Sequence, residues 1–191
     1  FPENEVHFFV SYFDYYQPEA YIAASDTYIE KDSKINEEID KLRHAATTAL
    51  LTRKDVIIIA SVSCIYGVGS PQNYAEMAIK FQKGERRLLD KTLRLLNDMQ
   101  YKRNDVDLHR GTFRVKGDVL DIFPAGADMV YRIEFFGDEV ERITEIDHLT
   151  GEILAEDDSV TVFPCSHYVT PKEQINKIIP EIEAEYENRL A

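Results

Sequence analysis

Aromatic side chains crowd one short stretch near the start of the chain. Residues 11–32 read S-Y-F-D-Y-Y-Q-P-E-A-Y-I-A-A-S-D-T-Y-I-E-K-D and hold five of the chain's 11 tyrosines. Their spacing fits neither a helix nor a half-buried strand, because a strand here would carry rings on both faces. Tyrosine combines a flat face for stacking with a hydroxyl that tolerates water, which suits contact with unpaired bases. The rings are Tyr12, Phe13, Tyr15, Tyr16, Tyr21 and Tyr28.

The stretch is predicted to form an aromatic hairpin or lobe with tyrosines on both sides. The sequence Gln17-Pro18-Glu19 breaks it, and a second extended run covers residues 22–29. Two alternatives stay open, a Tyr-rich pair of core strands and a protein-binding patch, since aromatic stripes more often serve packing.

The elements around this stretch have the order of an α/β crossover. Residues 6–10 read as a buried strand, and residues 34–53 carry apolar side chains at helical spacing, with Arg43 and Arg53 expected on or near the polar face. Residues 55–60 are a continuous apolar run, typical of strands buried in parallel sheets. The aromatic stretch is therefore predicted to be an insertion in an α/β core.

A loop rich in small residues follows, S-V-S-C-I-Y-G-V-G over residues 61–69. Ligands gather beyond the carboxyl ends of strands in open α/β sheets, and hydroxyl or backbone N–H groups there can meet a phosphate. An ordinary connecting loop is the alternative. The chain contains no G-x-x-x-x-G-K-[ST] sequence, so it holds no complete Walker loop.

The second half of the chain changes from helical to alternating periodicity. Ser70-Pro71 is expected to open a helix that ends at Lys83-Gly84, and a second helical segment to reach about Met99. From Tyr101 onward, alternating runs separated by glycine turns predict an antiparallel meander of about five strands. These runs cover residues 112–116, 119–124, 130–136, 139–146 and 160–163. A final helix is expected after Thr170-Pro171, interrupted or kinked at Pro180.

Charge is distributed unevenly along the chain. The formal net charge of −13 argues against a nucleic-acid coat and against an anionic membrane partner. Residues 86–116 nevertheless carry nine Lys or Arg against four Asp, whereas residues 138–158 carry nine acids and one Arg. This two-sided pattern favours an oriented protein partner.

Cysteine usage and the chain's start say little about chemistry. Cys64 and Cys165 have no metal-ligand spacing, which favours a reduced cytoplasmic setting without a metal site, and no apolar run is long enough for a membrane span. The chain begins Phe1-Pro2-Glu3 without an initiator Met, so we expect a piece of a longer protein.

Several long passages together resemble one family. They are S-Y-F-D-Y-Y-Q-P-E-A-Y, D-T-Y-I-E-K-D, I-I-I-A-S-V-S-C-I-Y-G, R-G-T-F-R-V-K-G-D-V-L-D-I-F-P-A, R-I-E-F-F-G-D-E-V-E-R-I and S-H-Y-V-T-P. They are similar to the UvrB component of the bacterial UvrABC excinuclease, and the resemblance covers essentially the whole chain. It implies damage recognition and verification in nucleotide excision repair.

The resemblance implies a fold and a DNA site. Residues 1–73 are expected to be part of a RecA-like helicase domain with the β-hairpin at 11–32, which clamps one strand of damaged DNA. Phe13 stands where members often carry Tyr. The implied DNA-binding residues are Tyr12, Phe13, Tyr15, Tyr16, Tyr21, Tyr28, Lys31, Arg43, Ser61, Ser63 and Tyr66.

A second implied site concerns a protein partner. Residues 74–168 are expected to be a small antiparallel-sheet domain that docks on UvrA, the damage-sensing component, and residues 169–191 a helix that returns to the helicase domain. The implied contacts are Arg103, Arg114 and Lys116, the last standing where many members have Arg. Lysine keeps the charge but loses the bidentate fork.

The resemblance also implies what lies elsewhere. ATP and magnesium, and the contact with UvrC, belong to regions of the parent outside this chain, so we expect no catalytic residue and no activity from it alone. The alternative is a protein-docking module like that of a transcription-repair coupling factor, without DNA binding of its own. Such a module should lack the tyrosine-dense stretch.

Overall fold

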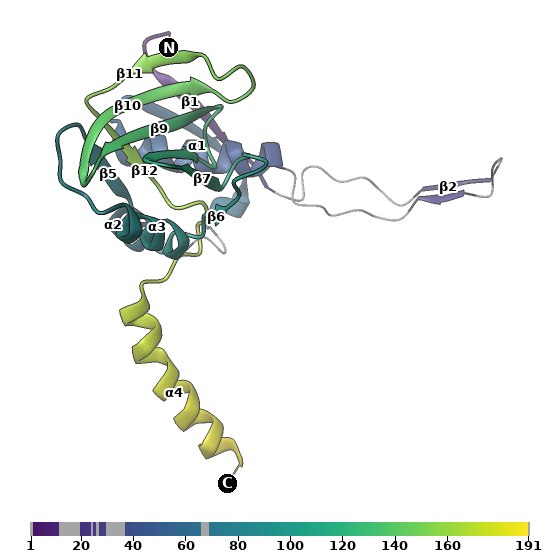
Figure 1. The fold of residues 1–191 in the computed structure, drawn as a ribbon. Coiled ribbons are helices and arrows are strands. Elements are labelled where there is room, and N and C mark those ends of the chain that lie inside the picture. Colours follow the sequence, from purple (N-terminus) through teal and green to yellow (C-terminus); the bar gives the residue numbers. More distant parts are fainter. Residues whose placement is uncertain are drawn as a thin grey trace. The chain divides into compact units, whose positions relative to one another are not determined.

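The computed structural model describes residues 2–11, 20–23, 25, 27–29, 37–65 and 69–190. The chain divides into two compact units, residues 1–68 with 125–127, and residues 69–124 with 128–191. Figure 1 shows the elements of both. None of the described helices is both long and apolar enough to cross a membrane.

The first unit contains a parallel strand pair and one long helix. Strands β1 (Glu5–Phe9) and β4 (Val56–Ala60) pair in parallel, and α1 (Glu37–Thr52) connects them and packs against both. This confirms the predicted α/β crossover. The unit also contains the antiparallel pair β2 (Ala20–Ile22) and β3 (Thr27–Ile29), and the short 3₁₀ helix η2 (Val62–Ile65).

The apolar stripe of α1 faces the strands, as its periodicity predicts. Ile39, Ala46 and Ala49 are buried, and Phe9 at the end of β1 is buried as well. The two strands themselves are less buried than predicted, since Ile59 is 54% exposed. The reason is that these two strands form a sheet of their own, so their apolar run is not enclosed by further described strands.

The second unit is built on a six-stranded sheet with the order β11-β10-β9-β8-β7-β6. All neighbours are antiparallel except β6 and β7, which are parallel. Its strands are β6 (Lys102–Arg103), β7 (Thr112–Lys116), β8 (Val119–Phe123), β9 (Met129–Phe136), β10 (Glu139–Asp147) and β11 (Ile153–Glu156). Two-residue turns at Gly117 and Gly137, both with positive φ, connect successive strands where the sequence predicts them.

A second, two-stranded sheet corrects two predictions. Residues 79–82 are not helical: α2 (Pro71–Glu76) ends early, and β5 (Ile79–Gln82) follows. The strand β12 (Ser159–Val162) pairs with β5 and does not close the meander. Phe81 fits both a helical and an alternating pattern, so the pairing with a strand far along the chain decides.

One face of the large sheet is covered by other elements, and the other carries charged residues together with a second buried apolar cluster of Phe123, Val130 and Ile146. Helix α3 (Leu89–Asp98), β5 and β12 pack on the first face around Phe81, Leu96 and Phe113. The predicted helix after Leu88 is thereby confirmed. Helix α4 (Lys172–Leu190) continues through Pro180, so the helix is not interrupted there, and the kink expected from the lost hydrogen bond stays a prediction.

Candidate functional site

The carboxyl ends of β1 and β4 meet at one edge of the first unit. Because the strands are parallel, the aromatic stretch departs from β1 beside the loop that follows β4. The Ser61 backbone N–H donates to the Phe9 carbonyl across a distance of 2.9 Å. The predicted loop site therefore lies next to the start of the aromatic stretch.

Arg43 connects these two segments from the helix. Its Nη1 donates to the Val10 carbonyl at 2.9 Å and contacts the Ser63 hydroxyl at 3.5 Å, and the guanidinium carbon lies 4.2 Å from the centre of the Phe9 ring. The side chain is only 4% exposed. The expectation that Arg43 lies on the polar face of the helix is wrong, because the helix turns this residue toward the strand ends together with Ile39 and Ala46.

Two hydroxyls lie at the same edge. The Ser61 and Ser63 oxygens are 2.7 Å apart, within hydrogen-bond distance, and both residues are half-buried. A partly exposed hydroxyl pair can donate to a phosphate oxygen, and Arg43 supports the pair from beneath. The predicted neighbours Lys31 and Tyr66 lie outside the described residues.

The next residue of the helix, His44, is buried beside this site. Its Nε2 lies 3.8 Å from an Asp40 carboxylate oxygen. Burial, and then the neighbouring positive charge of Arg43, lower the pKa of His44 to about 4, so the imidazole is neutral at pH 7. Gly126 lies against the helix backbone here: a Cβ on it would come within 2.7 Å of the Ala45 nitrogen.

The far part of the aromatic stretch forms the predicted hairpin pairing. Tyr21 on β2 lies directly opposite Tyr28 on β3, so the two rings project from the same face of the ribbon. Tyr21 is 61% exposed and Tyr28 57%. The predicted ring residues Tyr12, Phe13, Tyr15 and Tyr16 lie outside the described residues.

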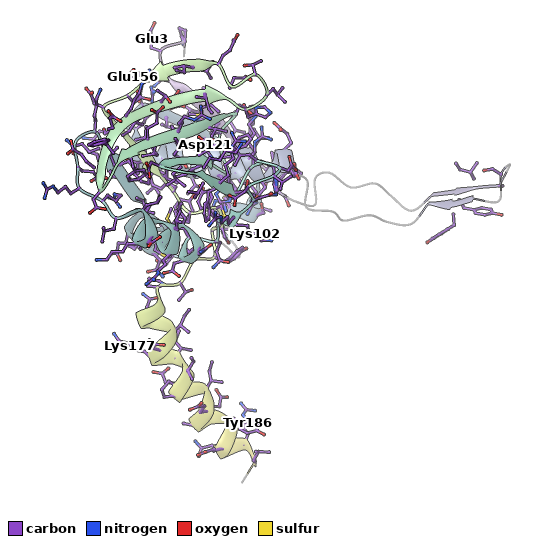
Figure 2. All side chains as sticks on the ribbon, in the orientation of Figure 1. Glu3, Lys102, Asp121, Glu156, Lys177 and Tyr186 are labelled. Carbon is purple, nitrogen blue, oxygen red and sulfur yellow. The ribbon has the colours of Figure 1, made fainter. Side chains whose placement is uncertain are left out.

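The second unit carries a row of charges on the face of its large sheet away from α3, in strands β7, β8 and β9. Arg114 lies opposite Asp121, which in turn lies opposite Arg132. Arg114 Nε donates to Asp121 Oδ2 at 2.8 Å, while Arg132 donates from Nε at 2.8 Å and from Nη2 at 3.1 Å. We call Arg114, Asp121 and Arg132 the charged row. Figure 2 labels Asp121 on the sheet.

The charged row combines a buried anion with two more accessible cations. The Asp121 side chain is 3% exposed, against 22% for Arg114 and 30% for Arg132. Burial by itself raises the pKa of Asp121, but hydrogen bonds from Arg132 and Arg114 outweigh it and hold the pKa below its usual value. Asp121 therefore carries a negative charge at neutral pH.

The other two predicted docking residues lie near β6 and the end of β7. Arg103 donates from Nε to Asp105, which also accepts the Val115 backbone N–H at 3.0 Å. The hydrogen bond from Arg103, and then that from Val115, lower the pKa of Asp105. Lys116 is exposed, and its charge adds to this lowering.

Two members of the charged row were absent from the predicted site, Asp121 and Arg132. The sequence carries a signal for each. Asp121 is a lone acid in the apolar run V-L-D-I-F, and Arg132 has the alternation position that places it on the polar face of its strand. An isolated acid in such a run indicates a buried, paired carboxylate. In the described part of the chain, no group of three or more His, Cys, Asp or Glu could hold a metal ion.

The family model and the similar proteins all belong to UvrB. Residues 79–168 match the family described as the UvrB interaction domain. The whole chain is 60% identical to the UvrABC system protein B of Caldicellulosiruptor bescii, 59% identical to that of Geobacillus kaustophilus, and 61% identical to that of Listeria monocytogenes. Each alignment covers 100% of this chain and 29% of the relative, so the chain spans less than a third of the length of these curated relatives.

Proposed function

Because the chain belongs to the UvrB family, we propose that it serves bacterial nucleotide excision repair as part of the UvrB component of a UvrABC system. Its second unit docks on UvrA, and its first unit contacts damaged DNA. The relatives' name and the matched interaction domain support the assignment to this system.

The docking assignment depends on where Arg114 lies. It is within the matched residues 79–168, on the sheet face opposite the larger apolar cluster around Phe113, and its side chain is 22% exposed. Its bond to Asp121 uses Nε, which leaves both Nη groups outside that bond. Arg114 therefore combines a fixed position with terminal donors that a partner can reach.

Three further cations extend this surface. Arg132 belongs to the charged row, while Arg103 and Lys116 lie at the β6 and β7 side of the same sheet. Arg103 is 52% exposed and is oriented by Asp105. We assign all four to the docking surface, with Arg114 and Arg132 at its best-ordered part.

The charge balance supports protein docking over coating of a DNA duplex. Phosphate contacts supply most non-specific DNA affinity, and a chain with a formal net charge of −13 is repelled by a polyanion. Local cations held on one sheet face can still meet individual carboxylates of a protein.

The hairpin supports a second function, contact with a single DNA strand. The exposed pair Tyr21 and Tyr28 presents two rings on one face of a ribbon, an arrangement on which unpaired bases stack. The hydroxyls of Ser61 and Ser63 offer donors for a backbone phosphate at the edge where the aromatic stretch begins. The tyrosine-dense stretch also argues against a pure docking module like that of a transcription-repair coupling factor.

We assign no catalytic step to this chain. The sequence has no Walker loop, so we assign ATP and magnesium binding to other parts of a UvrB protein. We likewise assign contact with UvrC elsewhere.

Calorimetry with purified UvrA from a bacterial UvrABC system tests the docking assignment. Arg114→Glu should abolish binding of this chain, because it places a negative charge beside Asp121 and removes the fork. Lys91→Glu is the matched control: it makes the same change in net charge on α3, which covers the opposite face of the sheet. Truncating a charged contact buried in an interface typically costs about 2–5 kcal/mol, so a loss of more than roughly thirtyfold is expected.

Loss with Arg114→Glu and unchanged binding with Lys91→Glu supports docking through the sheet face that carries Arg114. Equal losses indicate a general charge effect, and absence of binding by the unmodified chain contradicts the docking assignment.

A further inference from the structure

The two arginines of the charged row share one carboxylate, and they do so asymmetrically. Arg132 approaches Asp121 with two groups, Nε on Oδ1 and Nη2 on Oδ2. Arg114 approaches with Nε alone, on Oδ2. Both carboxylate oxygens of Asp121 are thereby occupied, and Oδ2 accepts from both arginines.

These bonds fix the planes of the two guanidinium groups, while some of their terminal Nη groups take no part in the bonds to Asp121. Arginine has five N–H groups in a rigid fork, and a bond through Nε fixes the direction of the Nη groups. Arg114 keeps both Nη groups outside the row, and Arg132 keeps Nη1. Because β7 and β9 flank β8 in the sheet, the two forks lie on either side of the same carboxylate.

Asp121 lowers the positive charge of the charged row, so it cannot improve the binding of an anion through charge. Two arginines alone carry two positive charges, and Asp121 reduces this to one. Any gain from Asp121 in binding an anion must therefore come from orientation, because its Coulomb effect on an anionic partner is unfavourable. Its almost complete burial fits this role, since a buried carboxylate is held in place by its neighbours.

We propose that Asp121 is a positioning residue that presents the forks of Arg114 and Arg132 to acidic side chains of a protein partner. The inference rests on the proposed function, because it concerns the surface assigned to docking on UvrA. It adds a residue that acts through the two arginines, whose forks form bidentate bonds with Asp or Glu carboxylates.

Neighbouring charges favour separate carboxylates over an extended polyanion. Glu134 follows Arg132 by two residues on the same face of β9, and Asp118 lies in the turn between β7 and β8. A nucleic-acid backbone passing along this face would meet these acids. A protein can place one or two carboxylates on the forks and leave the acids in water.

The substitution Asp121→Asn distinguishes the orientation of the two arginine forks from the net charge of the charged row. The change keeps the size of the side chain and makes the row more positive by one charge. A purely electrostatic surface would bind an acidic partner more tightly after this change, whereas the positioning role predicts weaker binding of UvrA, by about tenfold. Asp118→Asn is the control, since it removes one negative charge at an exposed turn residue of the same sheet.

A second measurement is independent of binding. Arginine Nε–H protons bonded to a buried carboxylate exchange slowly with water, so NMR of this chain should show two protected signals from the row. Arg114→Lys should remove one, Arg132→Lys the other, and Asp121→Asn both. Circular dichroism of each variant checks that the second unit is still folded.

The outcomes distinguish this inference from the docking assignment. Binding that survives Asp121→Asn at or above the Asp118→Asn value, while Arg114→Glu abolishes it, overturns the positioning role and leaves docking intact. If Asp121→Asn does not fold, the unmodified chain decides, because absence of the two protected Nε–H signals also overturns the proposal. No binding by the unmodified chain contradicts the docking assignment itself.

Discussion

The two units use the same residue type in opposite ways. In the first unit, Arg43 is 4% exposed and donates from Nη1, the end of its fork, to the Val10 carbonyl. In the second unit, Arg114 donates from Nε to a carboxylate, and its side chain is 22% exposed. Arg43 therefore uses the end of its fork to bind the chain just after β1. Arg114 is anchored through Nε, and its terminal Nη groups stay outside that bond.

Arg43 and Arg114 carry the same charge, so their different roles follow from the atom that each side chain contacts. Arg43 bonds a backbone carbonyl with the end of its fork and thereby stabilises the fold, whereas Arg114 is anchored through Nε and keeps its Nη groups for a partner. Arg43 thus supports the hydroxyls of Ser61 and Ser63 from within, and it does not itself line a surface. Stability and binding should therefore respond to different arginines.

The largest expected effect is on stability. Arg43→Met should lower the free energy of unfolding of the first unit by about 3 kcal/mol, because it leaves the Val10 carbonyl without its charged donor. Arg114→Met should cost about 1 kcal/mol or less, since Arg132 still pairs with Asp121. Urea denaturation followed by circular dichroism measures both. Similar losses for the two variants would contradict the distinction between the arginines.

Acid should weaken the two units in different pH ranges. The pKa of His44 is about 4 in the folded chain and 6.5 in the reference state, so the unfolded chain binds more protons between these values and stability falls as the pH falls through them. The loss between pH 7.5 and pH 5 should be about 2 kcal/mol for the first unit. Asp121 has a lowered pKa, so its contribution is present above the ordinary value of 3.8 and is lost only at lower pH.

Thermal melts at pH 7.5 and pH 5 measure this difference. His44→Gln should reduce the pH dependence of the first unit, and His109→Gln, at a largely exposed position, should leave it unchanged. A first unit whose melting shows the same pH dependence with and without His44 would contradict the prediction.

A smaller effect is expected for strand binding. Tyr28→Ala should weaken binding of single-stranded DNA about tenfold, because stacking on one ring contributes roughly 1–3 kcal/mol per base. Stability should change little, since Tyr28 is 57% exposed. Fluorescence anisotropy of a labelled oligonucleotide measures the affinity. Tyr186→Ala on α4, 64% exposed, is the control, and an equal effect of both substitutions would argue against stacking on the hairpin.

The smallest effect concerns Lys116. Lys116→Arg should tighten docking on UvrA by a few-fold, because a fork replaces a point charge at an exposed position of the docking surface. Lys91→Arg on α3 is the matched control. Calorimetry at two salt concentrations should show a gain for Lys116→Arg alone; weaker binding would place Lys116 outside the contact.

Periodicity and turn chemistry predicted much of the fold. A strand pattern, a helical pattern and a second apolar run predicted the crossover of β1, α1 and β4. The hairpins at Gly117 and Gly137 were readable because two-residue turns require positive φ, which glycine adopts without strain. The pairing of Tyr21 with Tyr28 confirms the predicted hairpin within the described residues.

The errors arose where two readings fit equally well. Phe81 suits both a helix continuing from Tyr74 and a strand with Ile79, and only pairing with β12 selects the strand. Arg43 was expected among polar residues because a charged side chain usually stays in water. The Val10 carbonyl and the Phe9 ring, which accommodate it, lie more than 30 residues earlier in the chain.

The sequence by itself determined which residues alternate, where the chain turns, and that one stretch is dense in tyrosine, because these are properties of neighbouring residues. Tertiary structure alone decided that Asp121 collects Arg114 and Arg132, and that Arg43 is buried. A pattern along the chain specifies which side of an element is apolar. It does not specify which distant atom will accept a given donor, since that depends on strand order and register.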